Sequence, residues 1–196
     1  DPWCSLDITL APELETRVRI AVGPPKCSKN NFSIYQNTVN ALLQRKVDSS
    51  EVPITVNVTF IASRRIDFSF VDLAKIVYYP RFWDLAHKFY EESWEFSCGL
   101  HYNEILFEKK IAFPLVHSEA NFLHPISYGD VIECRITVPR IGNSSISWNF
   151  EFRNQDEILC WSAEQITVCT EMQQVRSKIP VPDWIREGLA KMAPID

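Results

Sequence analysis

The sequence predicts an α+β fold in which one antiparallel sheet packs against a single long helix. Two observations predict it: the best helical pattern of the chain lies at about residues 80–98, and the apolar runs after it alternate with a period of two. A sheet of consecutive strands can bury the apolar face of one helix, which is an α+β arrangement. The chain has 196 residues, enough for one sizeable domain, alone or with an appendage.

The N-terminal part is predicted to be an extension, residues 1–53, ahead of a main domain at 54–196. A polar stretch at 48–51 followed by Pro53 marks the boundary. Before it we expect a strand at 16–22, a turn, and a helix at about 32–47, where apolar residues recur at helical spacing. A unit of this size buries little surface alone. We expect it to pack on the main domain; covering a sheet edge, closing the pocket and binding a partner are all open as its role.

The central helix is predicted at about 80–98. Pro80 suits the first helical turn, and Gly99 suits the C-terminal stop. Apolar residues recur at helical spacing, so they share one face, whereas Glu91 and Glu92 lie on the other. The residues of the apolar face are Phe82, Leu85, Ala86, Phe89 and Phe96.

Strands are predicted on both sides of this helix. Ahead of it, apolar and polar residues alternate over 54–60, and apolar residues at 66, 68 and 70 continue a period of two. After it, alternating runs separated by turns predict four consecutive antiparallel strands. These strands are expected at 112–122, 130–140, 144–153 and 157–169, before a short helix at 183–192.

Composition and charge exclude several classes of protein. The net charge is -5 and no basic run exceeds two residues, so a nucleic-acid partner is not expected. No apolar stretch approaches 18 residues, so no membrane span is expected. The six cysteines form no C-x-x-C pair, and Cys134, Cys160 and Cys169 lie in strand-like runs where a free thiol acts as a small hydrophobe. We therefore expect the cytoplasm or another reducing intracellular compartment.

Two separated segments resemble motifs of the 4-hydroxybenzoyl-CoA thioesterase family. Residues 68–80 read FSFVDLAKIVYYP, similar to that family's aspartate, short loop and I-V-Y-Y-P-like run ahead of the central helix. Residues 113–130 resemble its second strand and turn. The resemblance covers about residues 66–189 and favours the subgroup that acts on 1,4-dihydroxy-2-naphthoyl-CoA. It implies a hot-dog fold, in which the sheet wraps around the helix, and an acyl-CoA thioesterase.

Asp72 is the predicted catalytic residue. Thioester cleavage needs a nucleophile or a base, and stabilisation of negative charge on the thioester oxygen. Asp72 could attack the carbonyl carbon or activate a water, and the sequence leaves both open. The start of the helix supplies unpaired N–H groups and partial positive charge. The resemblance maps the oxyanion-binding amide to Tyr79, directly before Pro80. Glu91 and Glu92 are competing carboxylates, but a solvated helix face is expected for them.

Two positions in this loop depart from the family's pattern. A threonine usually precedes the aspartate and a glycine stands three residues after it, whereas this chain has Val71 and Lys75. Because glycine permits a positive φ, Lys75 predicts a loop that differs from its relatives. Phe70, where a polar residue is frequent, makes the approach to Asp72 more apolar and favours an aromatic acyl group.

Further binding residues are proposed from the resemblance and from charge. Tyr78 and Trp83 are candidates for the acyl pocket, and His117 could line it across a dimer interface or be an ordinary strand histidine. The phosphates of CoA need cationic partners. The candidates for that role are Arg140, Arg153, Arg176 and Lys178. No cofactor is expected, because CoA is part of the substrate, and no metal is expected, because no histidine pair has metal-ligand spacing.

The predicted reaction is hydrolysis of an aromatic acyl-CoA to the free acid and CoA. On resemblance, 1,4-dihydroxy-2-naphthoyl-CoA is favoured over 4-hydroxybenzoyl-CoA and fatty acyl-CoA. The resemblance also implies a homodimer or homotetramer with active sites at subunit interfaces. Two alternatives stay open: a thioesterase acting on polyketide or fatty chains bound to acyl-carrier protein, and a non-catalytic hot-dog binding or assembly module.

Overall fold

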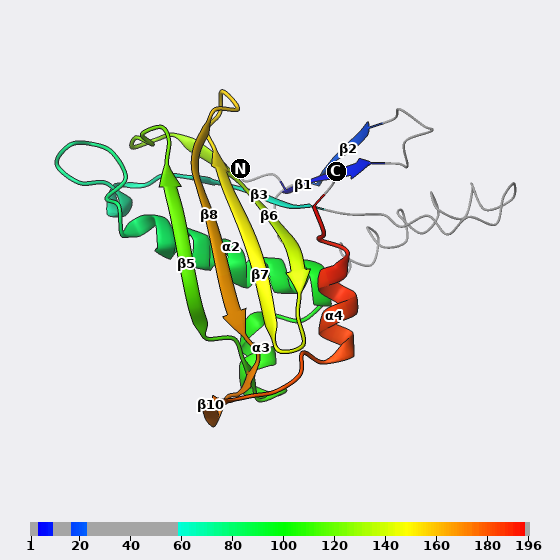
Figure 1. Ribbon diagram of the computed structural model, residues 1–196. Helices are drawn as coiled ribbons and strands as arrows, with labels where there is room; N and C mark the ends of the chain where they lie inside the picture. Colours follow the sequence, from blue (N-terminus) through cyan, green and yellow to red (C-terminus); the bar gives the residue numbers. More distant parts are fainter. Residues whose placement is uncertain (1–3, 10–16, 23–58, 195–196) are drawn as a thin grey trace, which may run out of the picture.

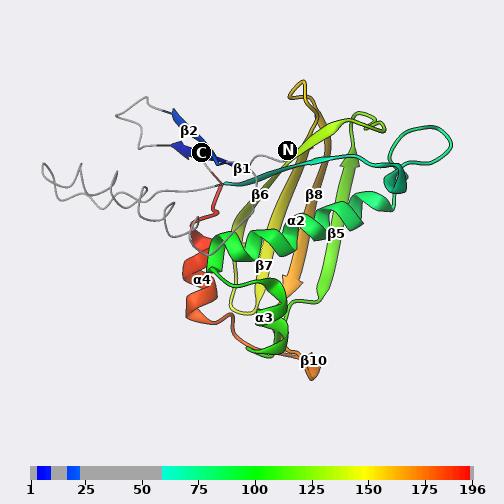
Figure 2. The ribbon, with the colours of Figure 1, turned by 180° about the vertical axis from the view of Figure 1, so that it is seen from behind.

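A seven-stranded antiparallel sheet wraps around one long helix in the computed structural model, which describes residues 4–9, 17–22 and 59–194 (Figure 1). The strand order is β2-β1-β3-β6-β7-β8-β5. The strands are β1 (Cys4–Thr9), β2 (Arg17–Val22), β3 (Phe60–Arg65), β5 (Leu115–Phe122), β6 (Val131–Ile141), β7 (Ser145–Arg153) and β8 (Leu159–Val168). The rear view shows the helix α2 (Arg81–Cys98) lying across one face of this sheet (Figure 2). The predicted α+β fold is confirmed.

Smaller elements complete the described part of the chain. A second sheet has the order β10-β9-β4 and lies at the end of the molecule away from the β7–β8 turn (Figure 1). Its strands are β4 (Ile111–Ala112), β9 (Thr170–Glu171) and β10 (Gln174–Lys178). The remaining helices are η2 (Phe68–Phe70), α3 (Tyr102–Phe107) and α4 (Asp183–Ala190).

Helix α2 forms where the sequence predicts it. Its apolar stripe packs on the sheet, with Leu85 and Phe89 fully buried. Gly99 ends the helix with a φ of 71°, and its N–H donates to the Glu95 carbonyl. Glycine suits this left-handed position because it has no Cβ to clash. The prediction of both ends of the helix is therefore confirmed.

The period-two patterns correspond to real strands. On β6 the buried residues are Ile132, Cys134, Ile136 and Val138, and on β7 they are Ile146, Trp148, Phe150 and Phe152. The predicted strand at 112–122 is instead split into β4 and β5. Pro114 lies at the break, where its missing N–H cannot contribute to a ladder. Helix α3 was not predicted at all; it starts with His101, whose N–H donates a hydrogen bond to the Glu104 carboxylate at 2.7 Å.

The expected strand-like continuation through residues 66–70 is wrong. Phe68–Phe70 forms the 3-10 turn η2, and Phe68 is 81% exposed whereas Phe70 is buried. The Asp67 carboxylate accepts the Ser69 N–H at 2.9 Å. Such a local side-chain bond offers the backbone an alternative to a sheet ladder. This turn ends β3 and directs the chain toward the Asp72 loop.

The N-terminal strands extend the same sheet. β1 and β2 pair as a hairpin from Cys4↔Val22 to Thr9↔Arg17, and β1 meets β3 at Cys4↔Ala62. The hairpin thus lies at the sheet edge opposite β5. β2 corresponds to the strand predicted at 16–22. The turn, the helix at 32–47, the boundary at 53 and most of the strand at 54–60 lie outside the described residues, so the division into two parts stays a prediction.

Candidate functional site

Asp72 begins a tight turn between two short bridged segments. Val71 and Val77 form an antiparallel bridge. The Asp72 N–H donates to the Ile76 carbonyl at 3.1 Å, and the Lys75 N–H donates to the Asp72 carbonyl at 2.9 Å. Lys75 has a φ of 65°. The backbone of Lys75 therefore takes the left-handed conformation that glycine would allow. That the loop differs from its relatives stays a prediction.

The Asp72 carboxylate is exposed and only partly engaged. Its Oδ1 accepts the Ala74 N–H at 2.8 Å, and no donor among the described residues bonds Oδ2. The loop between β3 and α2 projects beyond the β5 edge of the sheet in both views (Figures 1 and 2). Leu73 at its tip is fully exposed. One carboxylate oxygen is thus available to a ligand.

Tyr79 supplies a backbone donor beside the start of α2. The Tyr78 N–H donates to the Phe70 carbonyl at 2.9 Å, and the Arg81 N–H donates to the Tyr78 carbonyl at 2.8 Å. Pro80 has no N–H. In the part of the chain that the structure describes, no acceptor takes the Tyr79 N–H. The amide that the resemblance singled out is therefore unpaired, at the positive end of the helix dipole.

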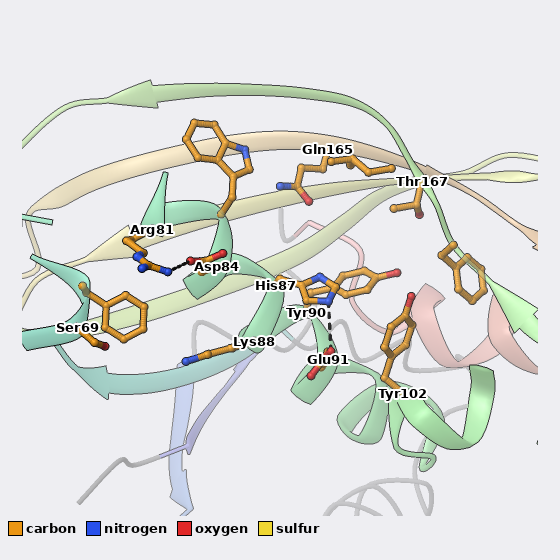
Figure 3. A pocket seen from close by; sticks show the side chains of 14 residues that line it. Ser69, Arg81, Asp84, His87, Lys88, Tyr90, Glu91, Tyr102, Gln165 and Thr167 are labelled. Carbon is orange, nitrogen blue, oxygen red and sulfur yellow. Dashed lines mark hydrogen bonds and ion pairs between the residues drawn. The ribbon is translucent and has the colours of Figure 1, made fainter. Parts of the chain in front are cut away.

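A groove of about 720 Å³ runs from this helix start along the exposed side of α2 (Figure 3). Phe70 and Arg81 line it near the Asp72 loop, and Tyr102 and Phe113 line its other end. Five of its fourteen lining residues carry phenyl, phenol or indole rings, and charged side chains of α2 line it as well. Such a shape suits a flat apolar group, with polar groups placed to orient it.

The predicted pocket residues lie in different places. Trp83 lines the groove, and its indole N–H donates to the Ser118 hydroxyl at 3.1 Å. The ring of Tyr78 is exposed and lies outside the groove, with its centroid 5.2 Å from that of the Tyr79 ring. His117 is exposed on β5, and because strand side chains alternate, it points to the face opposite Ser118. Of the three, the structure brings only Trp83 to the groove of its own chain.

The four cations proposed for CoA do not cluster within the chain. Arg140 pairs with Ser147, six residues along β7 from Arg153, which is about 20 Å at strand spacing. Arg153 is already bound to the Glu151 carboxylate at 2.9 Å. Arg176 and Lys178 are exposed on β10 at the far end of the molecule (Figure 1). They were proposed together because of their charge, before the positions of the strands in space were known.

The two competing glutamates both have side-chain partners on other residues. The Glu91 carboxylate lines the groove and lies 3.2 Å from His87 Nε2. Glu92 binds Arg64, and partial burial raises the pKa of Glu92 despite that cation. Neither carboxylate lies at the helix start, where the unpaired Tyr79 amide is.

Sequence reasoning missed most of the polar residues that line the groove, among them Tyr90, Tyr102, Gln165 and Thr167. Tyr90 lies buried on α2 and Thr167 within β8, and the sequence analysis assigned no role to either. Tyr102 belongs to the unpredicted helix α3. Over the described ranges, no group of three or more His, Cys, Asp or Glu side chains is placed to hold a metal ion, and no helix is long and apolar enough to cross a membrane.

Comparison with known proteins defines the class. Residues 66–189 match the thioesterase-like superfamily, and the chain belongs to that superfamily. The 1,4-dihydroxy-2-naphthoyl-CoA hydrolase of Nostoc punctiforme is 29% identical over 133 residues, which are 67% of this chain and 86% of that protein. The one from Synechocystis is 28% identical over 125 residues, 63% of this chain and 89% of the relative.

Solved structures of similar fold support the same assignment to the thioesterases. A 1,4-dihydroxy-2-naphthoyl-CoA thioesterase from Synechocystis matches with a TM-score of 0.61 and 26% identity, covering 67% of this chain and 96% of that one. The gentisyl-coenzyme A thioesterase BH1999 matches with a TM-score of 0.58 at 23% identity, over 64% of this chain and 98% of that one, and shares the fold. The predicted hot-dog fold and thioesterase class are confirmed.

Proposed function

We propose that the protein hydrolyses an aromatic acyl-CoA to the free acid and CoA. One observation carries the proposal: a free carboxylate oxygen on Asp72 and an unpaired N–H on Tyr79 flank the same short turn before α2. Relatives named 1,4-dihydroxy-2-naphthoyl-CoA hydrolase and the five aromatic side chains that line the groove support an aromatic acyl group. Among such substrates, 1,4-dihydroxy-2-naphthoyl-CoA is the one we favour.

The Tyr79 N–H and the helix dipole stabilise the oxygen that becomes negative when the thioester carbonyl is attacked. Loss of one such donor in another enzyme costs about 2.7–4 kcal/mol of barrier. Asp72 acts in one of two ways. As a nucleophile it forms a mixed anhydride and releases the CoA thiolate, and water then cleaves the anhydride. As a base it takes a proton from the attacking water, and the C–S bond breaks to give the acid and CoA.

A substrate panel tests this function. Release of free thiol is measured with 1,4-dihydroxy-2-naphthoyl-CoA, 4-hydroxybenzoyl-CoA, a fatty acyl-CoA and a fatty acyl-carrier-protein thioester. We expect the aryl-CoA esters to give the highest kcat/KM. Faster turnover of the carrier-protein thioester would move the assignment to that substrate class. If the protein turned over none of these thioesters, the alternative of a non-catalytic binding or assembly module would be favoured.

We propose further that the protein works as a homodimer joined through β5. Among the described strands β5 pairs only with β8, and it carries exposed apolar side chains at Leu115, Val116 and Phe122. An open apolar edge strand favours pairing with another strand. Two copies of β5 that pair antiparallel are related by a two-fold axis, so the assembly stops at a dimer. The outer sheet face favours a dimer over a tetramer, because its side chains form ion pairs such as Arg153–Glu151.

A reducing compartment fits the thiols of the described residues. Cys134, Cys160 and Cys169 are buried and free, and Cys98 is free and half-buried. Disulfides are rare where glutathione and thioredoxin keep thiols reduced. We therefore place the protein inside the cell, in the cytoplasm or a similar compartment.

A further inference from the structure

Gln165 presents an unpaired side-chain amide on the inner face of the sheet, where it lines the groove. Its neighbours across the strands are Trp148 on β7 and Ser118 on β5. The side chain is half-buried, and no hydrogen bond to its amide forms within the described part of the chain. An amide in an open groove is solvated by water, and a flat ring that binds there displaces that water. A ring without a polar atom then leaves the amide unpaired, which is unfavourable.

His87 lies on the opposite wall of the groove, on α2 (Figure 3). Trp83 is one turn earlier on this helix, so the two side chains share a face. The Trp83 indole N–H donates to the Ser118 hydroxyl at 3.1 Å, and Ser118 is the β5 partner of Gln165. The helix face that carries His87 is therefore turned toward Gln165. Figure 3 shows the imidazole between Gln165 and Glu91.

The imidazole of His87 is held in place with one ring nitrogen unpaired. Its Nε2 lies 3.2 Å from a carboxylate oxygen of Glu91. The ring stacks on Tyr90 at 5.8 Å between centroids and meets the edge of the Tyr102 ring at 6.3 Å. Because a carboxylate only accepts, Nε2 carries the proton, and Nδ1 of the neutral ring is an acceptor. No donor in the described part of the chain bonds Nδ1.

We propose that His87 and Gln165 bind a ring hydroxyl of the aromatic acyl group. The hydroxyl donates to His87 Nδ1 and accepts an N–H of the Gln165 amide. A hydroxyl does both at once, whereas an ether oxygen only accepts. The proposal rests on the proposed thioesterase function and adds the feature of the acyl group that the groove selects. His87 and Gln165 are specificity-determining residues, and Glu91 is a positioning residue because it sets the tautomer of His87.

The distance along α2 fits a ring of this kind. Tyr79 and His87 are eight residues apart, which is about 12 Å at the helical rise. Helical side chains lean back toward the N-terminus, so the imidazole lies nearer to Tyr79 than its own Cα does. Two hydrogen bonds of about 3 Å each, one at either end, leave about 6 Å or less between the carbonyl oxygen and the ring oxygen. One aromatic ring with its hydroxyl opposite the thioester has this length.

Binding of free acids tests the selection without turnover. The protein is titrated with 4-hydroxybenzoate and with benzoate, and quenching of tryptophan fluorescence reports occupancy beside Trp83. We expect the hydroxylated acid to bind about 10-fold more tightly. His87→Phe, which keeps a flat ring at an exposed position, should remove this preference and keep the affinity for benzoate. His124→Phe, outside the groove, should keep the preference. Equal binding of the two acids, or a preference that survives in His87→Phe, would overturn the proposal.

A methoxy probe separates the two hydrogen bonds. The oxygen of 4-methoxybenzoate accepts but does not donate, so it gains only the bond from the amide. Gln165→Leu should weaken its binding, whereas His87→Phe and the control Gln174→Leu on β10 should not. The opposite dependence would overturn the assigned donor and acceptor. Glu91→Leu should lower the affinity for 4-hydroxybenzoate and leave that for 4-methoxybenzoate unchanged. An equal loss for both acids would show that Glu91 does not act through the tautomer of His87.

Turnover distinguishes failure of the selection from failure of the function. We expect His87→Phe to lower kcat/KM for 4-hydroxybenzoyl-CoA about 10-fold and to leave that for benzoyl-CoA unchanged. An equal fall for both thioesters would overturn His87 as a specificity residue. A wild-type protein that cleaves aryl-CoA thioesters without preferring the hydroxylated ring would refute the selection and keep the function. A wild-type protein that prefers 4-hydroxybenzoate but cleaves no thioester would refute the function and keep the binding site.

Discussion

Lys75 carries a backbone conformation that side chains with a Cβ seldom adopt, at the turn that positions Asp72. Its φ of 65° turns the chain back so that the Ile76 carbonyl accepts the Asp72 N–H. A left-handed residue with a Cβ costs roughly 1–2 kcal/mol relative to glycine. The hydrogen bonds of the turn hold Lys75 in this conformation in spite of the cost.

Substitution at Lys75 measures that cost. We expect Lys75→Gly to be more stable than Lys75→Ala by about 1 kcal/mol, because both remove the side chain and only alanine keeps the Cβ. The measurement is urea unfolding followed by circular dichroism. Leu73 is the matched control, since it is exposed in the same loop without a positive φ. There the order should reverse, and the same order at both positions would contradict the explanation.

At the residue scale, the sequence predicted the Asp72 turn as the site but not the groove beside it. Asp72 and Tyr79 could be proposed because they stand in one contiguous motif, which a sequence shows directly. Tyr90 and Thr167 were not found, because a buried polar side chain among apolar neighbours looks like core until its partners are known. Arg140 and Arg153 were proposed together on charge, but the register of β6 and β7 places them about 20 Å apart.

At the scale of elements, α4 is held against α2 by a close approach at Gly188. A Cβ added there would lie 2.7 Å from Cys98 Sγ and 2.9 Å from the Ser97 carbonyl oxygen. Contacts this short force the two helices apart. The short C-terminal helix was predicted from its pattern, but this contact joins residues far apart in the sequence and left no local signal.

We expect Gly188→Ala to destabilise the protein by about 1–3 kcal/mol, the usual cost of overpacking. Thermal unfolding of the variant is compared with that of Glu187→Ala, the exposed neighbour on α4, which should change little. An unchanged stability for Gly188→Ala would show that the two helices separate without cost.

Strands and helices were predicted well where the sequence has a strong local pattern of apolar and polar residues. The strands β6 and β7 were predicted well because buried and half-buried residues alternate strictly along them. The errors at η2 and α3 have one cause. In each, a side chain bonds the backbone locally, Asp67 to Ser69 and Glu104 to His101, and such bonds override the apolar pattern.

At the scale of the whole molecule, the exposed edge strand β5 predicts the assembly. We expect Val116→Lys to convert the dimer to a monomer, because an edge lysine opposes strand pairing. The mass is measured by light scattering. Val175→Lys is the matched control, since Val175 is similarly exposed, on β10. A dimer that survives Val116→Lys and dissociates with Val175→Lys would place the interface elsewhere.

Loss of the dimer should also abolish turnover, because each Asp72 loop lies at the β5 end that faces the second copy. A monomeric Val116→Lys variant with full thioesterase activity would contradict a shared site. That result would show that a single chain carries out catalysis without a second copy.

The central claim is that Asp72 carries thioester hydrolysis. The most direct measurement is kcat/KM for 1,4-dihydroxy-2-naphthoyl-CoA with Asp72→Asn, which keeps the shape and removes the charge. We predict a fall of about 10²–10⁴-fold, the usual contribution of such a group, with no change for Asp156→Asn at the exposed β7–β8 turn. An unchanged rate for Asp72→Asn in a folded protein would contradict the account.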